Sequence, residues 1–196
     1  GWARAILFND HLRQEFERFF HRADSITLGV CNGCQMLAQL APIIPGASHF
    51  KSMKQNLSQQ FEARFTLVEL PKSQSVLLKD LYGTRFPIAV SHGEGRFQHG
   101  NYEVLKLRDK QLTTMHFVND EGKLETSYPG NPNGSACGLA GLCSGDGRVT
   151  IMMPHPERVV LRSQLSFVPP GTGVITPWMT LFDNAWHFIM GRSVND

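Results

Sequence analysis

The sequence predicts an α/β fold with an open, mainly parallel sheet, helices on both faces, and an antiparallel hairpin near the C-terminal part. Two observations lead to this prediction. Short apolar runs rich in β-branched residues recur along the chain, and segments with helical periodicity lie between them. One of these runs, residues 25–30, passes directly into a sharp turn and a helix, as strands of parallel sheets do. In such sheets the active crevice lies at the carboxyl ends of the strands.

The N-terminal part of the chain is predicted to form a helix, a strand and a second helix. Apolar residues at three- and four-residue spacing, with charged residues between them, indicate an amphipathic first helix that packs through Phe8, Leu12, Phe16 and Phe19. Residues 25–30 then form the strand, 31–35 the turn and 36–40 the second helix. Proline and glycine within residues 42–46 end that helix.

The rest of the chain is predicted to consist mostly of strands. Residues 61–67 alternate between apolar and polar side chains, which is typical of a half-buried strand. Further strands are expected over residues 87–90, 112–118, 138–143 and 149–153. The Ser-Gly-Asp-Gly turn at 144–147 joins the last two as a hairpin. A loop rich in proline and glycine, 168–177, leads to a final helix from 178 to about 190.

Composition narrows the classes of protein that need considering. A chain of 196 residues with 41% hydrophobic residues fits one globular domain, so we expect a single domain over residues 1–196. A formal charge of +2 without a basic run argues against a nucleic-acid partner. The chain has neither the roughly 20 consecutive apolar residues of a membrane helix nor a secretory signal, so we expect a cytoplasmic protein with no membrane contact.

The four cysteines are expected to be free thiols. They are too few for a disulfide scaffold, and no secretory context favours oxidation. The chain also begins with Gly-Trp-Ala, rather than with methionine, in a segment that is already helical. We therefore expect a fragment of a longer polypeptide, with a domain that is incomplete at its N-terminus.

Cys31 is a candidate nucleophile because it follows the strand 25–30 and precedes a helix. A nucleophile on such a turn sits in a strained backbone and needs small residues two positions away on either side. Gly29 and Gly33 occupy these two positions. The dipole and free N–H groups at the start of the helix favour the thiolate form of the cysteine, and backbone amides there can bind an oxyanion.

A second segment offers the base that such a nucleophile needs. The apolar run 149–153 ends in Pro-His-Pro-Glu, which presents His155 and, two residues later, Glu157. A cysteine nucleophile needs a base to accept its proton, and the imidazole needs a carboxylate to fix its tautomer. The prolines on both sides of His155 restrict the loop. The residues therefore indicate a Cys-His-Glu triad, against the alternative of a buried thiol and a structural loop.

The two motifs GVCNGCQ and PHPE resemble the class I, or triad, glutamine amidotransferases, whose patterns are G-x-C-x-G-x-Q and H-x-E. The chain is more similar still to the glutaminase domain of the long, single-chain phosphoribosylformylglycinamidine synthases. The similar stretches cover nearly the whole chain and are GWARAILFN, GVCNGCQMLAQL, FEARFTLVEL, PIAVSHGEGRF, YPGNPNGS and VTIMMPHPER. This resemblance implies the flavodoxin-like fold of class I glutamine amidotransferases, with its first strands missing here.

The resemblance also implies a role for each site residue. Cys31 attacks the side-chain amide of glutamine, releasing ammonia and leaving a thioester, while His155 transfers the proton and Glu157 orients His155. Water then releases glutamate. The other implied residues are Asn32, through its backbone amide at the oxyanion position, and Gln35 and His92, in substrate binding.

The same resemblance implies where the cofactors and the partner lie. This domain itself needs no cofactor and no metal. Its ammonia passes to the synthetase region of the full-length chain, where ATP and magnesium support conversion of formylglycinamide ribonucleotide to formylglycinamidine ribonucleotide in purine biosynthesis. In the family a glycine-rich loop upstream of GWA supplies a second oxyanion amide. We expect a chain that starts after this loop to lack half of the oxyanion hole, which typically lowers the rate about 100- to 1000-fold.

Other interpretations of the same residues stay open from the sequence alone. The spacing Cys31-x-x-Cys34 also suits a redox pair or half of a zinc site, although no second ligand pair of zinc-site spacing is present. A non-catalytic docking module, a cysteine hydrolase for another substrate, and the separate small glutaminase subunit of some purine pathways are the rival functions. Residues 131–135, Asn-Pro-Asn-Gly-Ser, are interpreted as a cluster of turn residues.

Overall fold

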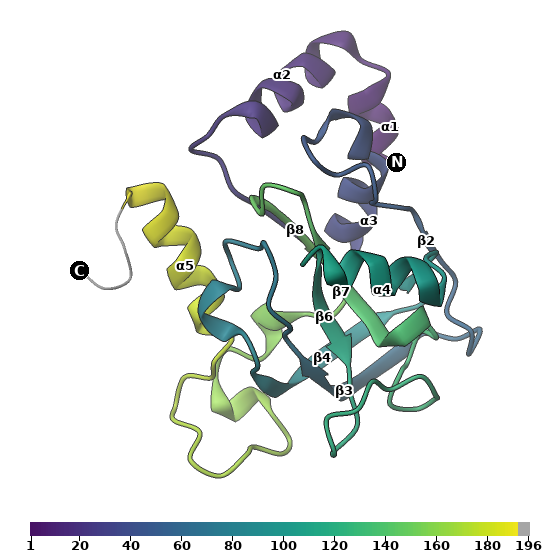
Figure 1. The fold of residues 1–196 in the computed structure, drawn as a ribbon, viewed down its shortest axis with the longest axis vertical. Helices are drawn as coiled ribbons and strands as arrows, with labels where there is room; N and C mark the ends of the chain where they lie inside the picture. Colours follow the sequence, from purple (N-terminus) through teal and green to yellow (C-terminus); the bar gives the residue numbers. More distant parts are fainter. Residues whose placement is uncertain (192–196) are drawn as a thin grey trace.

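The computed structural model describes residues 1–191 and shows an α/β fold (Figure 1). The predicted domain extends over 192–196 as well, and those residues lie outside the described part. The helices are α1 (Trp2–Leu7), α2 (Asp10–His21), α3 (Asn32–Gln39), α4 (Asn101–Asp109) and α5 (Met179–Met190). The strands are β1 (Thr27–Val30), β2 (Met53–Lys54), β3 (Glu62–Glu69), β4 (Arg85–His92), β5 (Arg96–Phe97), β6 (Thr113–Phe117), β7 (Leu139–Cys143) and β8 (Val149–Met152).

Six of the strands form one sheet in the order β1-β8-β7-β6-β3-β4, and β2 pairs with β5 in a separate ribbon. The α/β fold is confirmed, but the sheet is mixed rather than mainly parallel. Within residues 1–191 only β1 and β8 pair in parallel, and the other four pairings of the main sheet are antiparallel. Strands joined by a tight turn, such as β7 and β8, can pair only antiparallel, whereas β1 and β8 are far enough apart in sequence to allow a crossover.

The predicted first helix is two helices, because the chain breaks at Phe8 and Asn9. The Asn9 side chain caps α2 by accepting a hydrogen bond from the backbone N–H of Leu12 (3.1 Å). This break changes which side chains face the core. Phe8 is 83% exposed, whereas Phe20, which was not among the predicted packing residues, is only 2% exposed. Figure 1 shows α1 and α2 together at one end of the molecule.

The other predicted elements agree with the structure, with shifts of a few residues at their ends. The strand before Cys31, the hairpin β7–β8 and the last helix lie where the sequence places them. Three elements, the two-residue strands β2 and β5 and the helix α4, were not predicted, and α4 is the longest of them. The hydrophobic periodicity of α4 is weak, and this helix buries only Val104 and Leu107.

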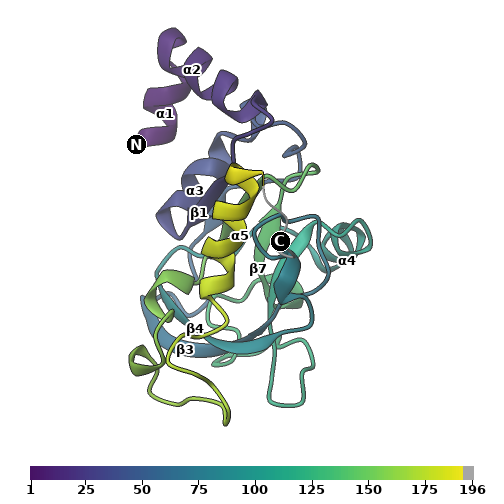
Figure 2. The same cartoon turned by 90° about the vertical axis from the view of Figure 1, so that its left-hand side faces the viewer.

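The sheet carries a hydrophobic core on each face, so helices on both faces are confirmed. One core takes side chains from α1, α2, α3 and α4 together with Leu142 and Ile151 of the hairpin. The other takes Leu181 of α5 together with Met115 and Met152 of the sheet. Figure 2, viewed from the side of the molecule on which α5 lies, shows this helix in front. No helix in the described part of the chain is long and apolar enough to cross a membrane.

Candidate active site

The parallel pair β1–β8 brings the predicted nucleophile and base to the same edge of the sheet. Val30 lies beside Met152 in the register, and the backbone N–H of Cys31 donates to the carbonyl of Met152 (2.9 Å). His155 follows β8 three residues later. Because the carboxyl ends of parallel strands meet at one edge, residues more than a hundred positions apart in sequence become neighbours.

Cys31 has the strained backbone that its sequence position predicts. Its φ of 52° and ψ of −106° lie in a region that residues with a side chain rarely adopt, and it forms the N-terminal boundary of α3. The chain therefore turns sharply from β1 into α3 at this residue. The turn exposes part of the Cys31 side chain, while Cys34, one helical turn later, is fully buried.

Gly29 is required by its surroundings, whereas Gly33 is not. A Cβ atom on Gly29 would lie 2.5 Å from Cδ1 of Leu37 and 2.9 Å from the carbonyl oxygen of Gly33. A Cβ atom on Gly33 would meet nothing within 4 Å. The prediction that both glycines avoid a clash around the nucleophile thus holds for Gly29 only.

This difference predicts opposite outcomes for two alanine substitutions. Gly29→Ala is expected to destabilise the protein by about 1–3 kcal/mol, because β1 and α3 must move apart. Gly33→Ala is the matched control, and it is expected to be neutral or to stabilise by up to about 1 kcal/mol, since alanine favours the helix. Urea unfolding of both variants measures the difference. Equal destabilisation by the two would show that the close approach of β1 and α3 does not fix the turn.

His155 is held by one hydrogen bond from its backbone and by a direct contact of its ring with Glu157. Its backbone N–H donates to the carbonyl of Ala89 on β4 (2.8 Å), and its Nδ1 lies 2.6 Å from Oε1 of Glu157. Arg158 approaches the same carboxylate oxygen only loosely, at 3.7 Å. Because Nδ1 faces Glu157, the ring presents Nε2 as the nitrogen that can exchange a proton with a neighbour. Nε2 is buried and has no hydrogen-bond partner among the described residues.

The groups around His155, Cys31 and Glu157, favour its protonated form. The nearby Cys31 thiol, and after it the Glu157 carboxylate, raise the pKa of His155 to about 9 against the opposing effect of burial. Burial raises the pKa of Glu157, but the hydrogen bond from His155 and its charge outweigh this, so the pKa of Glu157 lies below its usual value. A cationic imidazole beside Cys31 stabilises negative charge on the sulfur. In the resting structure the thiol donates to the carbonyl of Ser91 (3.6 Å).

His92 lies beside this group as a buried, neutral imidazole. It is 3% exposed, and neither ring nitrogen has a hydrogen-bond partner within residues 1–191. Burial, and next the charge of His155, lower the pKa of His92 to about 4. The ring lies over Gly95, where any Cβ atom would be only 2.2 Å from it. Its predicted role in substrate binding stays a prediction.

Asn32 and Gln35 lie at the start of α3, the helix that follows Cys31. Asn32 is the first residue of the helix, so its backbone N–H has no acceptor within the helix and can serve an oxyanion. The Gln35 side chain donates from Nε2 to the carbonyl of Glu94 (2.6 Å), which leaves its Oε1 as an acceptor. A cavity of about 230 Å³ is lined by both residues together with Trp2.

Comparison with known proteins identifies the family. The family model of CobB/CobQ-like glutamine amidotransferase domains matches residues 1–189. The chain belongs to this family of glutamine amidotransferases. The solved structure of PurLQS from Thermotoga maritima has 20% sequence identity and a TM-score of 0.57. The match covers 92% of this chain and spans 65% of the length of that one. At this identity the likeness concerns the fold.

In this glutamine amidotransferase Cys34 is part of the core. Its side chain is fully buried in the core beneath α3, and burial raises the pKa of its thiol well above the usual value. All four cysteines are free. The residues described by the structure contain no group of three or more His, Cys, Asp or Glu side chains able to hold a metal ion.

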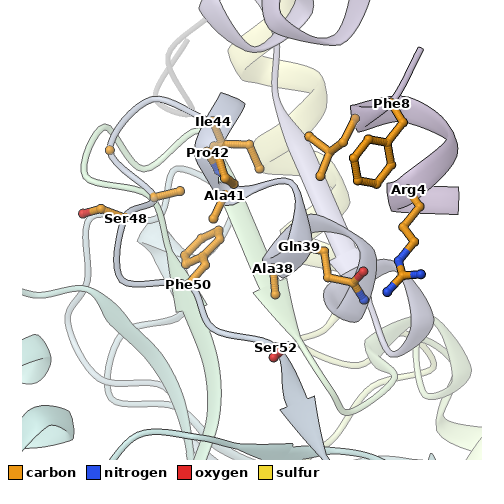
Figure 3. Close-up of a pocket in the computed structure, with 13 residues that line it drawn as sticks. Arg4, Phe8, Ala38, Gln39, Ala41, Pro42, Ile44, Ser48, Phe50 and Ser52 are labelled. Carbon is orange, nitrogen blue, oxygen red and sulfur yellow. The ribbon is translucent and has the colours of Figure 1, made fainter. Parts of the chain in front are cut away.

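A larger cavity of the amidotransferase lies away from the triad. Its volume is about 820 Å³. Figure 3 shows Arg4 of α1 and Phe8, which directly follows α1, on one side and Pro42, Ile44 and Phe50 on the other. None of the predicted site residues lines it, so cavity size alone does not locate the chemistry.

Sequence reasoning missed the contribution of β4 to the site. The carbonyls of Ala89 and Ser91, two residues apart on one strand edge, bind His155 and Cys31 respectively. Backbone groups leave no side-chain signature. The only available signal was the position of the SHGEG motif directly after an apolar strand.

Proposed function

We propose that the chain is a glutaminase in which Cys31 attacks the side-chain amide of glutamine. The thiolate adds to the amide carbon, and the resulting oxyanion is bound by the backbone N–H of Asn32. His155 donates its proton to the amide nitrogen, the carbon–nitrogen bond breaks, and ammonia leaves behind a thioester. His155 then takes a proton from water, whose oxygen attacks the thioester. The carbon–sulfur bond breaks, which returns the Cys31 thiolate beside the protonated His155, and the new carboxyl group loses its proton to solvent as glutamate leaves.

The observation that carries this proposal is the arrangement of three side chains, in which His155 interacts with Cys31 and with Glu157. The nucleophile has positive φ at a helix N-terminus, and the base beside it binds a carboxylate through Nδ1 at 2.6 Å. The carboxylate fixes the tautomer in which Nε2 serves the sulfur. Membership of the glutamine amidotransferase family supports glutamine as the substrate.

Labelling with a diazo-ketone analogue of glutamine tests the proposal. Such a compound alkylates a nucleophile only after binding as glutamine does, so we expect one adduct, on Cys31, that is prevented by added glutamine. Peptide mass spectrometry of the labelled full-length protein locates the adduct. Labelling that is spread over several cysteines, or that glutamine does not reduce, would contradict a glutaminase site.

We further propose that the ammonia serves purine biosynthesis. The chain is the glutaminase part of a phosphoribosylformylglycinamidine synthase, in which the synthetase region of the same full-length polypeptide uses ATP and magnesium to convert formylglycinamide ribonucleotide to formylglycinamidine ribonucleotide. The motifs GVCNGCQMLAQL, PIAVSHGEGRF and VTIMMPHPER support this assignment, as does the similarity in fold to PurLQS. This function places the protein in the cytoplasm, with no metal or cofactor bound by the glutaminase domain itself.

A further inference from the structure

Two buried asparagine side chains, neither of them part of the triad, bind the loop that follows β4, and a buried serine supports one of them. Residues 93–95 leave β4 and carry no ladder hydrogen bonds of the main sheet. The side chain of Asn56 donates to the carbonyl of His92 (2.8 Å) and accepts from the N–H of Gly95 (3.0 Å). The side chain of Asn133 donates to the carbonyl of Gly95 (2.9 Å). Both polar groups of Gly95 are thus bound by asparagine side chains.

The turn Asn131–Ser135 fixes the Asn133 amide with further bonds. Oδ1 of Asn133 accepts from the N–H (3.0 Å) and the Oγ–H (2.7 Å) of Ser135. Ser135 Oγ in turn accepts from the N–H of Phe97 (3.0 Å). Asn56, Asn133 and Ser135 are each at least 98% buried. Buried polar side chains whose hydrogen bonds are all made hold one geometry strongly.

The loop held in this way meets the predicted substrate-binding residue. The carbonyl of Glu94, next to Gly95, accepts the hydrogen bond from Nε2 of Gln35 (2.6 Å). The triad is anchored elsewhere, because Cys31 and His155 bind Ser91 and Ala89 on β4 itself. A shift of the loop would therefore release Gln35 while the triad keeps its contacts.

We propose that Asn133, supported by Asn56 and Ser135, is a positioning residue that sets the Glu94 carbonyl and thereby the Gln35 side chain for glutamine binding. This inference rests on the proposed glutaminase function. It gives the Asn-Pro-Asn-Gly-Ser turn, which the sequence analysis interpreted as a turn cluster, a role at the active site.

The substitution Asn133→Asp removes only the donor to Gly95. The oxygen that serves Ser135 is kept, while a second oxygen faces the Gly95 carbonyl and repels it. We expect KM for glutamine to rise about tenfold or more, because a buried hydrogen bond is lost, with a smaller change in kcat. The rate at which iodoacetamide alkylates Cys31 is expected to stay near that of the wild type, since this reagent needs the triad but no glutamine contact.

Asn131→Asp is the matched control in the same turn. Asn131 is equally buried, but its side chain bonds only Ser135 and Gly134 within the turn. If the turn acts merely as a structural element, the two variants will change KM equally. The proposal requires the Asn133 variant to raise KM several-fold more than the control. Equal KM values, or an effect of Asn133→Asp on iodoacetamide alkylation as large as that on KM, would overturn it.

A double-mutant cycle tests whether Asn133 acts through Gln35. Gln35→Leu alone is expected to raise KM, and adding Asn133→Asp is expected to raise it little further. Independent, multiplicative effects would overturn the proposed route. If Asn133→Asp fails to fold, Ser135→Ala replaces it, because it removes the acceptor for Phe97 and one bond to Asn133. An unchanged KM in that variant would also overturn the proposal.

The same measurements separate failure of this proposal from failure of the proposed function. If the wild-type full-length protein does not hydrolyse glutamine and its Cys31 is not protected by glutamine, the glutaminase assignment is wrong. If the wild type behaves as a glutaminase and only the Asn133 effects are missing, the positioning role alone is wrong.

Discussion

Replacing Cys31 with alanine is expected to abolish glutamine-dependent synthesis in the full-length protein and to leave synthesis from added ammonia largely intact. No other group at the site can form the thioester, so the glutaminase rate should fall by about 10⁴-fold or more. Free ammonia bypasses this step entirely. Product formation is measured with glutamine and, in parallel, with an ammonium salt as the nitrogen source.

Cys34→Ala provides the control for this substitution. Cys34 lies on the same helix, fully buried and packed into the core. Its removal is expected to lower stability by about 1 kcal/mol, since a small buried side chain is truncated, and to leave both nitrogen sources usable. Loss of both reactions in the Cys31 variant would instead assign Cys31 a structural role.

Glu157→Gln is expected to have the second largest effect. The amide keeps the size of the side chain but removes the charge that fixes the tautomer of His155, which typically lowers the rate by about 10³- to 10⁴-fold. The proton affinity of the ring should also change. Glu157 is one of the two groups that raise the pKa of His155 to about 9, so the pKa of His155 in the variant is expected to be lower.

The pH dependence of Cys31 alkylation by iodoacetamide reports this change. In the wild type, His155 keeps its proton until the pH approaches about 9, so its positive charge stays beside the Cys31 sulfur up to that pH. In Glu157→Gln the ring should lose its proton at a lower pH, so the upper break in the profile should move toward acid. Arg158→Gln serves as the control, because Arg158 is half-exposed and 3.7 Å from the carboxylate. A Glu157 variant with the wild-type profile would show that the carboxylate does not act on His155.

The sharp turn at Cys31 and the contact between His155 and Glu157 were predictable because their signals are local. A short apolar strand, a glycine two residues before Cys31 and a helix directly after it define the turn within seven residues. The prolines around His155 and the spacing to Glu157 are equally local. Each of these motifs shapes its own backbone, and the hydrogen bond between His155 and Glu157 needs no distant residue.

Features that depend on distant pairing were not predictable in the same way. The alternation in residues 61–67 indicates a strand, but it does not say that β3 pairs antiparallel with both β4 and β6. The hydrogen bond from Asn133 to Gly95 joins segments 38 residues apart. An asparagine in a turn motif gives no sign of such a contact, because it fits an ordinary turn equally well. At the N-terminus the regular spacing of apolar residues hid the break at Asn9, whose capping contact competes with helix continuation.

Because φ of Cys31 is positive, the residue that would make the fold most stable at this position differs from the residue that activity requires. A residue with a side chain pays on the order of 1–3 kcal/mol to adopt this backbone conformation, whereas glycine adopts it without that penalty. Glycine, however, carries no thiol. Selection for fold stability alone therefore favours loss of the nucleophile at this residue, and only selection for turnover opposes it. A homologous chain that has stopped hydrolysing glutamine is thus expected to lose its cysteine here early, while Gly29, which the packing of β1 against α3 requires, persists.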